Sequence, residues 1–363
     1  MGAPMILSGD PPRGRVLTTL IVIVVVLLAA APFLFPGSKP LNVASKICVF
    51  TLVVAAYDLL LGYTGIVSFA HTMFYGLGSY GVAIALYTLG ATWPAVGAGL
   101  AGGLLVAVVL ALAIGLFSLR VQTIFFAMVT LAVASAFAVL ASQLSWLTGG
   151  EDGRTFRVPE LLQPGSKLIA QSLFGVTING RIVTYYLIFL CVVAAFLLLL
   201  RIVNSPFGRV LQAIRENPFR AEALGFRVVV YRTLAVVLAA VFAAFGGALN
   251  ALWLRYAGPD TTLSFSIMLD ILVMVVIGGM GTLWGAVLGA SLYVIAQNYL
   301  QALLGAAFRT LSDSPLKPLA GFVDPDRWLL WLGLLFILCV YFFPSGIVGQ
   351  LRRVRSGEPV DRA

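Results

Sequence analysis

Apolar residues fill the chain in long uninterrupted stretches, and polar residues gather in the short intervals between them. Most of these stretches hold about 20 residues, enough for a helix to cross roughly 30 Å of hydrocarbon. The strands of a membrane barrel would instead alternate in polarity over about 10 residues, and no such alternation is present. The pattern predicts an all-α integral membrane protein with about ten membrane helices, at residues 16–35, 42–61, 66–87, 93–117, 123–147, 182–201, 233–256, 265–278, 282–304 and 327–344.

The composition excludes an ordinary soluble domain. Hydrophobic residues occupy 61% of the 363 positions and the mean hydropathy is +1.03, whereas soluble domains are about 45–50% apolar. We therefore expect a single transmembrane domain over residues 1–363, embedded in a lipid bilayer. The first apolar run, at 16–35, is longer than the core of a usual signal peptide, so a retained anchor is favoured over a cleaved one.

The net charge of +9 is interpreted as membrane topology and not as nucleic-acid binding, because basic residues favour the cytoplasmic ends of spans. With the N-terminus in the cytoplasm, the inner segments hold thirteen Lys and Arg residues and the outer ones nine. The sequence then predicts a cytoplasmic insert at 202–232 and a cytoplasmic tail at 345–363. Outer loops are expected at 148–181 and 305–326. Arg215, Arg352 and Arg353 would share the cytoplasmic side, opposite Glu151 and Asp313.

Two junctions between predicted spans, 62–65 and 278–282, are glycine-rich and too short and apolar for ordinary loops. Irregular backbone at membrane depth is tolerated where protein buries it or where it lines a watery cavity, so interrupted helices indicate a transport pathway. The alternative is that these glycines serve close helix packing. The candidate pathway residues are Gly62, Thr64, Gly65, Ser68, His71, Gly278, Gly279, Gly281 and Thr282.

The segment at 205–225, SPFGRVLQAIRENPFRAEALG, concentrates charge in a chain of which only 10% is charged. Ser205-Pro206 and Asn217-Pro218 each predict an N-cap followed by a first helical residue, and Gly225 predicts a left-handed stop. A modest apolar stripe is expected from Val210, Leu211, Ile214 and Leu224. Two capped short helices are more than the positive-inside rule requires, which favours a docking element over a plain surface helix. Its candidate residues are Arg209, Arg215, Glu216, Asn217, Arg220, Glu222 and Gly225.

Ionisable residues within the spans are functional candidates by default. His71 is the only histidine and is expected either to bond across helices or to line the pathway. Asp58, Asp270 and Lys46 should face other helices or water, and a proton relay through the aspartates stays open. No metal site is expected, because no second ligand lies at metal spacing from His71.

Motifs of catalysis are missing from the sequence. It contains no G-x-x-x-x-G-K-[ST], no G-x-S-x-G and no H-E-x-x-H. The chain is therefore not expected to be an enzyme, to bind a nucleotide through a P-loop or to carry a cofactor.

From about residue 42 to 350 the chain resembles permease subunits of bacterial ABC importers for branched-chain amino acids, specifically the M-type subunit of the Liv system, and six segments in order carry this resemblance. The segments are GYTGIVSFAHTMFYGLGSY at 62–80, LRVQTIFFAMVTLA at 119–132, LTGGEDG at 147–153, 205–225, MVVIGGMGTLWGAVLGA at 274–290 and FFPSGIVGQL at 342–351. The resemblance implies the ABC importer permease architecture, with 205–225 as the element that docks on an ATPase.

The same resemblance implies the partners: a homologous H-type permease as heterodimer partner, two cytoplasmic ATPase subunits that bind ATP-Mg, and a periplasmic binding protein. It places the chain in a bacterial inner membrane with both termini cytoplasmic. The expected function is uptake of branched-chain or related apolar amino acids. Two alternatives stay open: a urea or short-amide ABC importer, and a proton-coupled secondary transporter using Asp58, Asp270 or His71.

Overall fold

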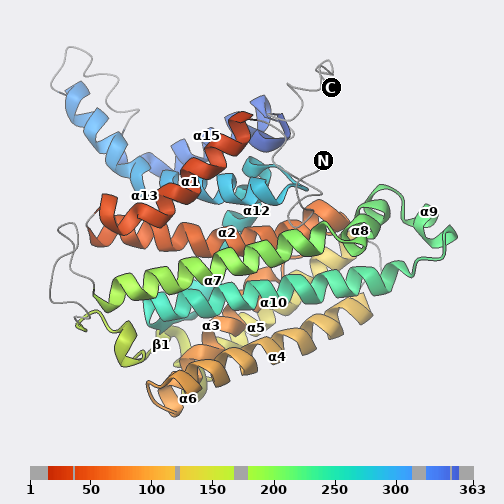
Figure 1. Cartoon of the computed structure of the whole chain (residues 1–363), viewed down its shortest axis with the longest axis horizontal. Coiled ribbons are helices and arrows are strands. Elements are labelled where there is room, and N and C mark those ends of the chain that lie inside the picture. Colours follow the sequence, from red (N-terminus) through yellow and green to blue (C-terminus); the bar gives the residue numbers. More distant parts are fainter. Residues whose placement is uncertain are drawn as a thin grey trace, which may run out of the picture.

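The computed structural model consists almost entirely of helices (Figure 1). It describes residues 15–35, 37–118, 123–166, 179–312, 324–343 and 346–350. The long helices match the predicted spans in number and order, which confirms the fold class. They are α1 (Arg15–Leu34), α2 (Ser38–Thr64), α3 (His71–Thr88), α4 (Trp93–Ser118), α5 (Thr123–Gln143), α7 (Gly180–Val203), α10 (Val228–Leu254), α12 (Phe265–Gly278), α13 (Leu283–Ser312) and α15 (Trp328–Phe342).

Short elements connect the long helices. Two strands pair antiparallel, Arg154 opposite Ala257 and Thr155 opposite Tyr256, and so fasten the segment after α5 to the end of α10. The short elements are α6 (Ser145–Thr148), η1 (Gly150–Asp152), β1 (Arg154–Thr155), η2 (Glu160–Leu162), α8 (Pro206–Glu216), α9 (Pro218–Ala223), β2 (Tyr256–Ala257), α11 (Pro259–Thr262) and η3 (Pro325–Arg327).

Helix α2 forms the centre of the bundle. Within its apolar stretch 94% of the residues are buried, and α7, α10, α12 and α13 all pack against it. Helices α3 and α10 approach so closely that a Cβ on Gly247 would lie 1.8 Å from the Tyr75 carbonyl oxygen. Small residues at such contacts are typical of helix packing in membranes, where close backbone approach provides the attraction.

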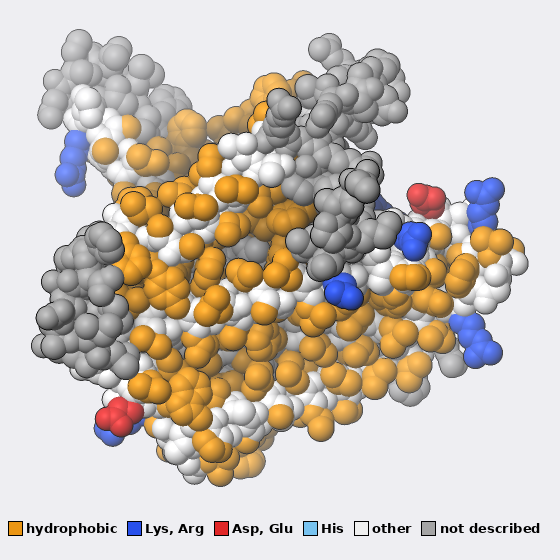
Figure 2. Space-filling model, viewed as in Figure 1, with side chains coloured by type: hydrophobic (Ala, Val, Ile, Leu, Met, Phe, Trp, Pro, Cys, Tyr) orange, Lys and Arg blue, Asp and Glu red, His pale blue; other side chains and the backbone are white. Residues whose placement is uncertain are grey.

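Nine helical stretches of the described residues are long and apolar enough to cross a membrane. Helix α3 is not among them, because it carries His71, Ser79 and three tyrosines, although His71, Ser79, Tyr75 and Tyr80 are buried among neighbouring helices. The peripheral helices expose apolar side chains instead: only 17% of the apolar stretch of α5 is buried. Orange hydrophobic surface covers the visible face between two charged ends (Figure 2). The chain is a multi-pass membrane protein.

Several predicted boundaries are wrong. Helix α2 continues through Gly62 and Thr64, so the first break lies at 65–70 and the next helix begins at His71 and not at residue 66. Helix α13 runs on to Ser312, so the first part of the predicted loop at 305–326 is helical; Arg309 in its last turn suits a helix C-terminus. The predicted insert at 202–232 shrinks to 204–227, and α5 ends at Gln143.

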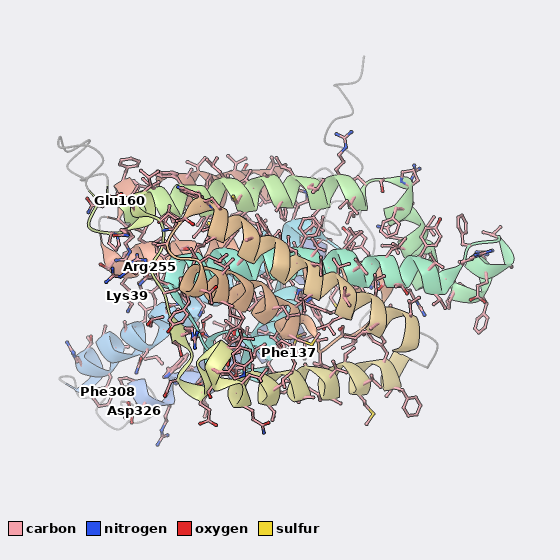
Figure 3. The ribbon with its side chains drawn as sticks, turned by 90° about the horizontal axis from the view of Figure 1, so that it is seen from below. Lys39, Phe137, Glu160, Arg255, Phe308 and Asp326 are labelled. Carbon is pink, nitrogen blue, oxygen red and sulfur yellow. The ribbon has the colours of Figure 1, made fainter. Side chains whose placement is uncertain are left out.

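The two ends of the bundle carry different elements. Lys39, Glu160, Arg255 and Asp326 lie at the end opposite α9 (Figure 3), and α6 with η1 lies at that end as well, far from α8 and α9 (Figure 1). Asp313, Arg352 and Arg353, which the sequence also assigned to sides of the membrane, lie outside the described residues, as do 167–178 of the first outer loop and most of the tail.

We expect the end that carries Glu151 and Glu160 to face outward and the end that carries Arg215 and Arg220 to face the cytoplasm. In a background without Cys48, Cys191 and Cys339, a membrane-impermeant maleimide added to intact cells should label Glu151→Cys and not Arg220→Cys. Both side chains are exposed, so access depends only on the side of the membrane. Labelling of Arg220→Cys in intact cells would reverse the orientation.

Candidate functional site

The segment between α7 and α10 forms two short helices that project from one end of the bundle (Figure 1). The Asn217 side chain accepts a hydrogen bond of 2.9 Å from the Arg220 N–H, which confirms that cap. Gly225 has φ +91°. The N–H groups of Gly225 and Phe226 bond to the carbonyls of Glu222 and Ala221, a Schellman stop.

Ser205 occupies the predicted N-cap position of α8 with an extended backbone, but the predicted side-chain bond does not form. Its side chain accepts no capping hydrogen bond, and its hydroxyl instead donates to the Ile202 carbonyl at 2.6 Å. The carbonyls at the end of α7 lack intrahelical partners. The Ser205 hydroxyl donates to one of them and is therefore not used as an acceptor for α8. Pro206 still begins α8, since proline needs no partner for an N–H that it lacks.

Helix α8 is held by a buried face. Leu211 and Ile214 are fully buried, and Phe207 stacks on Tyr231 with ring centroids 5.8 Å apart. The predicted stripe fails at Leu224, which is 71% exposed. Asn217 has an extended backbone, φ −156° and ψ 99°, so the helical register of α8 does not continue into α9.

The predicted coupling residues all have exposed positions on this element. Sequence reasoning missed Phe219, which is 81% exposed on α9; Leu224, at the end of that helix, is also exposed. Large apolar side chains exposed in a charged, water-facing segment indicate contact with another protein. The signal for Phe219 in the sequence was its place directly after the helix-starting Pro218.

The two glycine-rich breaks have defined geometry. In the first, Gly65 adopts φ +71° and the Phe69 N–H donates to the Thr130 hydroxyl of α5 at 3.0 Å. In the second, Gly279 and Gly281 adopt φ +112° and +82°, and the Thr282 hydroxyl donates to the Gly279 carbonyl at 2.9 Å. Positive φ suits glycine alone at little cost, which explains why the breaks fall at these residues.

Arg215 of α8 connects the two breaks. Its guanidinium donates to the carbonyl of Gly62, near the end of α2, and Gly281 lies so near that an added Cβ would be 3.0 Å from the same Nη1. Asp58, one turn before Gly62, accepts a hydrogen bond of 2.8 Å from the Gly281 N–H. The predicted coupling element and the ends of both predicted breaks therefore meet at one place.

Gly62 has a packing role in this arrangement. A Cβ there would lie 2.3 Å from the Gly281 nitrogen and 2.1 Å from Asp58 Oδ1. Glycine thus allows the 279–282 turn to lie directly on α2. Of the two interpretations of the glycine-rich junctions, close helix packing describes the geometry at Gly62.

His71 is fully buried, and its Nε2 lies 3.0 Å from the Val53 carbonyl of α2. Its ring packs against Tyr57 at 5.2 Å between centroids. This is the bond across helices that the sequence left as one of two alternatives. Lining of a pathway by His71 stays a prediction, while its neighbour Thr72 borders the groove described below.

Lys46 and Asp270 belong to one polar cluster between α2, α12 and α13. Lys46 donates to the side-chain oxygen of Gln297 at 2.8 Å, and the Gln297 amide donates to Asp270 at 3.3 Å. The Tyr293 hydroxyl donates to the other carboxylate oxygen of Asp270. These bonds satisfy both charged groups away from lipid, as predicted for charges inside spans. Among the described residues no group of three His, Cys, Asp or Glu side chains could hold a metal ion.

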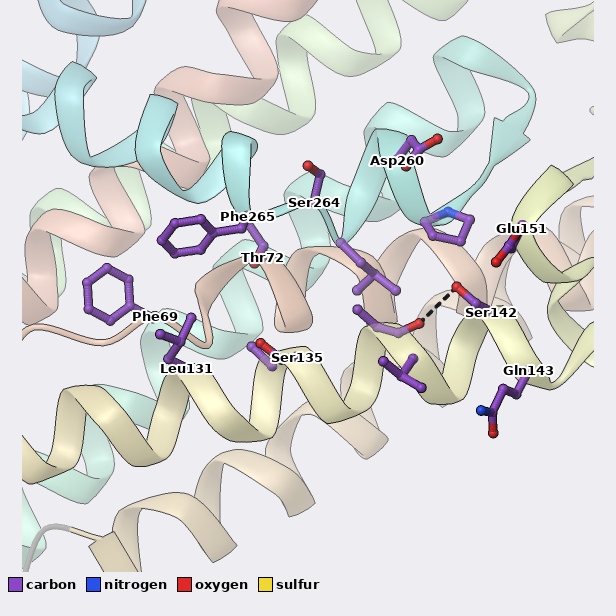
Figure 4. A pocket seen from close by; sticks show the side chains of 15 residues that line it. Phe69, Thr72, Leu131, Ser135, Ser142, Gln143, Glu151, Asp260, Ser264 and Phe265 are labelled. Carbon is purple, nitrogen blue, oxygen red and sulfur yellow. Dashed lines mark hydrogen bonds between the residues drawn. The ribbon is translucent and has the colours of Figure 1, made fainter.

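A groove of about 530 Å³ lies between α3, α5 and the start of α12 (Figure 4). None of the predicted pathway residues lines it, although Phe69 and Thr72 directly flank Ser68 and His71. No signal in the sequence marked the α5 face, because α5 has no charged residue. Its lining residues are Phe69, Thr72, Leu131, Ala134, Ser135, Ala138, Val139, Ser142, Gln143, Glu151, Pro259, Asp260, Leu263, Ser264 and Phe265.

Comparison with known proteins agrees with this architecture. Residues 39–340 match the family described as branched-chain amino acid transport system / permease component. The chain is 24% identical to the permease protein LivM of Salmonella typhimurium, over 91% of this chain and 75% of that protein. It is 26% identical to BraD of Pseudomonas aeruginosa, over 83% and 92%, and 22% identical to LivH of Salmonella typhimurium, over 88% and 97%.

No solved structure matches the chain. The family match covers most of the sequence, including both breaks and the α8–α9 element, and the named relatives are transport permeases. The chain therefore belongs to the family of permease components of branched-chain amino acid transport systems.

Proposed function

We propose that this chain is the membrane-spanning subunit of an ATP-driven, binding-protein-dependent importer of branched-chain or related apolar amino acids. It would lie in a bacterial inner membrane and pair with a homologous permease. Two cytoplasmic ATPases would supply the energy, and a periplasmic binding protein would deliver the substrate. Both LivM and LivH are named as permeases of high-affinity branched-chain amino acid transport systems, and their joint resemblance to this chain favours a permease pair.

The contact of Arg215 with Gly62 is the observation that carries this proposal. The exposed tip of α8–α9 offers Phe219 and Leu224 to a partner, while the inner side of the same element bonds to the end of α2. A partner that moves α8 therefore pulls on α2 directly. The Asp58 bond to the Gly281 N–H passes this displacement to the α12–α13 turn.

The mechanism follows from where the chain can bend. Helices resist bending in their interiors, whereas glycines at positive φ in the two breaks carry no β-carbon and turn more freely. Movement of α8 would tilt α3 and α12 relative to α2. Tilting at these positions changes access to the space between α3, α5 and α12 from one side of the membrane to the other.

The proton-driven alternative uses groups that have structural partners. Asp270 accepts hydrogen bonds from Tyr293 and Gln297, and Asp58 accepts one from Gly281. A carrier for urea or short amides would share the same coupling geometry. Measurement of the energy source therefore distinguishes the proton-driven transporter from the proposed importer, and measurement of the substrate distinguishes the urea or amide carrier.

The test is uptake into proteoliposomes that contain the permease pair and the ATPases. We expect leucine uptake to require ATP on the ATPase side and liganded binding protein on the other, and to persist in the presence of an uncoupler. Uptake that an uncoupler abolishes and that needs no ATP would establish the secondary transporter instead. ATP-dependent uptake of urea or acetamide without uptake of leucine would establish the alternative substrate.

A further inference from the structure

Basic residues gather at the end of the bundle opposite α9. Lys39 lies in the first turn of α2, Arg181 lies in the first turn of α7, and Arg255 directly follows α10. Figure 3 shows Lys39 and Arg255 at this end. Basic residues near spans favour the cytoplasmic side, so the expected topology gives no reason for such a cluster at the opposite end.

Asn42 of α2 holds the cluster together. Its side-chain oxygen accepts a hydrogen bond of 2.8 Å from Arg181 and one of 3.1 Å from the Trp253 indole. Arginine and tryptophan side chains only donate, so the amide oxygen must point toward them and the amide N–H groups must point elsewhere. Asn42 is exposed, and these N–H groups donate to no described residue. They are therefore available to a ligand.

The positive charge of the two arginines has no counter-ion among the described residues. The guanidinium carbon of Arg181 lies 5.5 Å from the centroid of the Trp253 ring, and Arg255 follows Trp253 by two residues. Burial, and to a smaller extent the nearby Arg181, lowers the pKa of Arg255 from its ordinary value. Neither arginine pairs with a described acid, and Arg255 Nε is buried without a described hydrogen-bond partner. An anion would relieve both deficits.

The backbone of Arg255 is strained. Its φ of 54° is the only positive φ of a non-glycine residue in the described part of the chain, and glycine would adopt it at less cost. Strain of this kind is retained where the side chain has a role. A cation suits the C-terminus of α10, but the dipole at the start of α7 disfavours Arg181. Helix dipoles therefore do not explain the pair.

We propose that Arg181, Arg255 and the Asn42 amide bind a phosphate group at the surface of the membrane. Their donors come from three different helix ends, and a phosphate presents at least three acceptor oxygens to such donors, whereas a carboxylate presents two. Helix ends lie near the depth of lipid headgroups, so the phosphate can belong to a phospholipid or be free in water. The site requires only that the chain spans a membrane, and it is independent of the transported substrate.

The test follows thermal unfolding of the purified full chain in an uncharged detergent, because a ligand of the folded state raises the unfolding midpoint. We expect dioleoyl phosphatidylglycerol to raise the midpoint in a saturable manner. Dioleoylglycerol, which has the same chains and no phosphate, should not. An equal rise with inorganic phosphate or glycerol 3-phosphate would identify free phosphate as the source, and a rise with the phospholipid alone would identify the headgroup.

Single variants assign the donors. Arg181→Gln and Arg255→Gln should each raise the phosphatidylglycerol concentration for a half-maximal effect at least about tenfold, because a charge-assisted bond is lost. Arg309→Gln is the matched control, since Arg309 is exposed in the last turn of α13 and its neighbour Phe308 lies at the same end of the bundle (Figure 3).

Asn42→Asp separates ligand binding from a structural role. It keeps an acceptor for Arg181 and Trp253 and adds a carboxylate that takes the place of the missing anion. We expect its midpoint without ligand to lie above that of the unsubstituted chain, and phosphatidylglycerol to raise it no further. A structural role of Asn42 alone would leave the response to the lipid unchanged.

Several outcomes would overturn the assignment. One is an unsubstituted chain whose midpoint responds to neither phosphatidylglycerol nor free phosphate. Another is an unchanged response in Arg181→Gln, Arg255→Gln and Asn42→Asp alike. If no phosphate compound binds and Arg255→Gln instead weakens binding of the purified periplasmic binding protein, the cluster is a protein-docking surface.

Discussion

Reversal of charge at Arg215 is expected to reduce both leucine uptake and the ATPase activity that liganded binding protein stimulates. Arg215→Glu removes the donor to the Gly62 carbonyl and places in its stead a carboxylate, which has no proton to donate to that oxygen. We expect leucine uptake by the reconstituted complex to fall at least about tenfold. Stimulation of ATPase activity by liganded binding protein should collapse as well. A tenfold loss corresponds to about 1.4 kcal/mol, close to the lower limit of about 1.5 kcal/mol for one hydrogen bond to a charged group.

Other variants separate this internal contact from docking on the ATPase. The exposed tip of α9 is intact in Arg215→Glu, so the ATPase subunits should still co-purify. Glu222→Lys and Phe219→Ala alter the exposed face and should reduce co-purification itself. Gly225→Val, at φ +91° with no atom within 4 Å, disrupts the helix stop without a change of charge and should also weaken docking.

Arg227→Glu is the charge-matched control, because Arg227 is exposed outside α8 and α9. Normal uptake and normal ATPase stimulation in Arg215→Glu would show that the contact with Gly62 transmits nothing. Unchanged co-purification of the ATPase subunits in Glu222→Lys, Phe219→Ala and Gly225→Val would show that α8–α9 is a charged surface element that does not dock on the ATPase.

A leucine at Gly281 is expected to abolish uptake. Its Cβ would lie 3.0 Å from Arg215 Nη1 and 3.1 Å from the Gly62 carbonyl oxygen, at φ +82°. The backbone conformation alone costs a non-glycine residue about 1–2 kcal/mol, and an overpacked contact adds roughly 1–3 kcal/mol. The combined strain should displace the 279–282 turn from α2 and break its link to α8. Gly279→Leu, at φ +112°, is expected to have the same effect.

Gly90→Leu provides the matched control. Gly90 has φ +86°, and nothing lies within 4 Å of its Cβ direction, so this variant carries the backbone strain without the close approach. Leucine uptake should be measured in membrane vesicles and normalised to the amount of inserted, assembled permease. Uptake in Gly281→Leu at the level of Gly90→Leu would mean that the turn at 279–282 takes no part in transport.

The sequence was sufficient where structure depends on neighbours along the chain. Each membrane span can be recognised from the length of its own apolar stretch, because the thickness of the bilayer sets that length. The Asn217 cap, the Gly225 stop and the end of α12 at Gly278 are likewise local, because each depends on the conformation of one or two residues. Family motifs in their order then indicated a permease for branched-chain amino acids, as the family match shows.

Tertiary structure decided what depends on segments distant in sequence. Gly62 and Gly65 look alike in the sequence, yet one packs inside α2 against Gly281 and the other ends the helix. Leu224 fits the apolar stripe of α8 by count, but the extended Asn217 turns it outward. The spacing of apolar residues in the sequence does not show that the chain changes direction at Asn217.

The same division applies to the site. The sequence by itself determined that the chain crosses the membrane many times, has two glycine-rich interruptions and carries one capped, charged insert. Only the folded bundle brings Arg215 from the insert onto Gly62 and Gly281, and only it assembles a groove from Thr72, Glu151 and Phe265. The physical reason is that local hydropathy and caps act within a few residues, whereas these contacts join residues tens to hundreds of positions apart, and only packing fixes their approach.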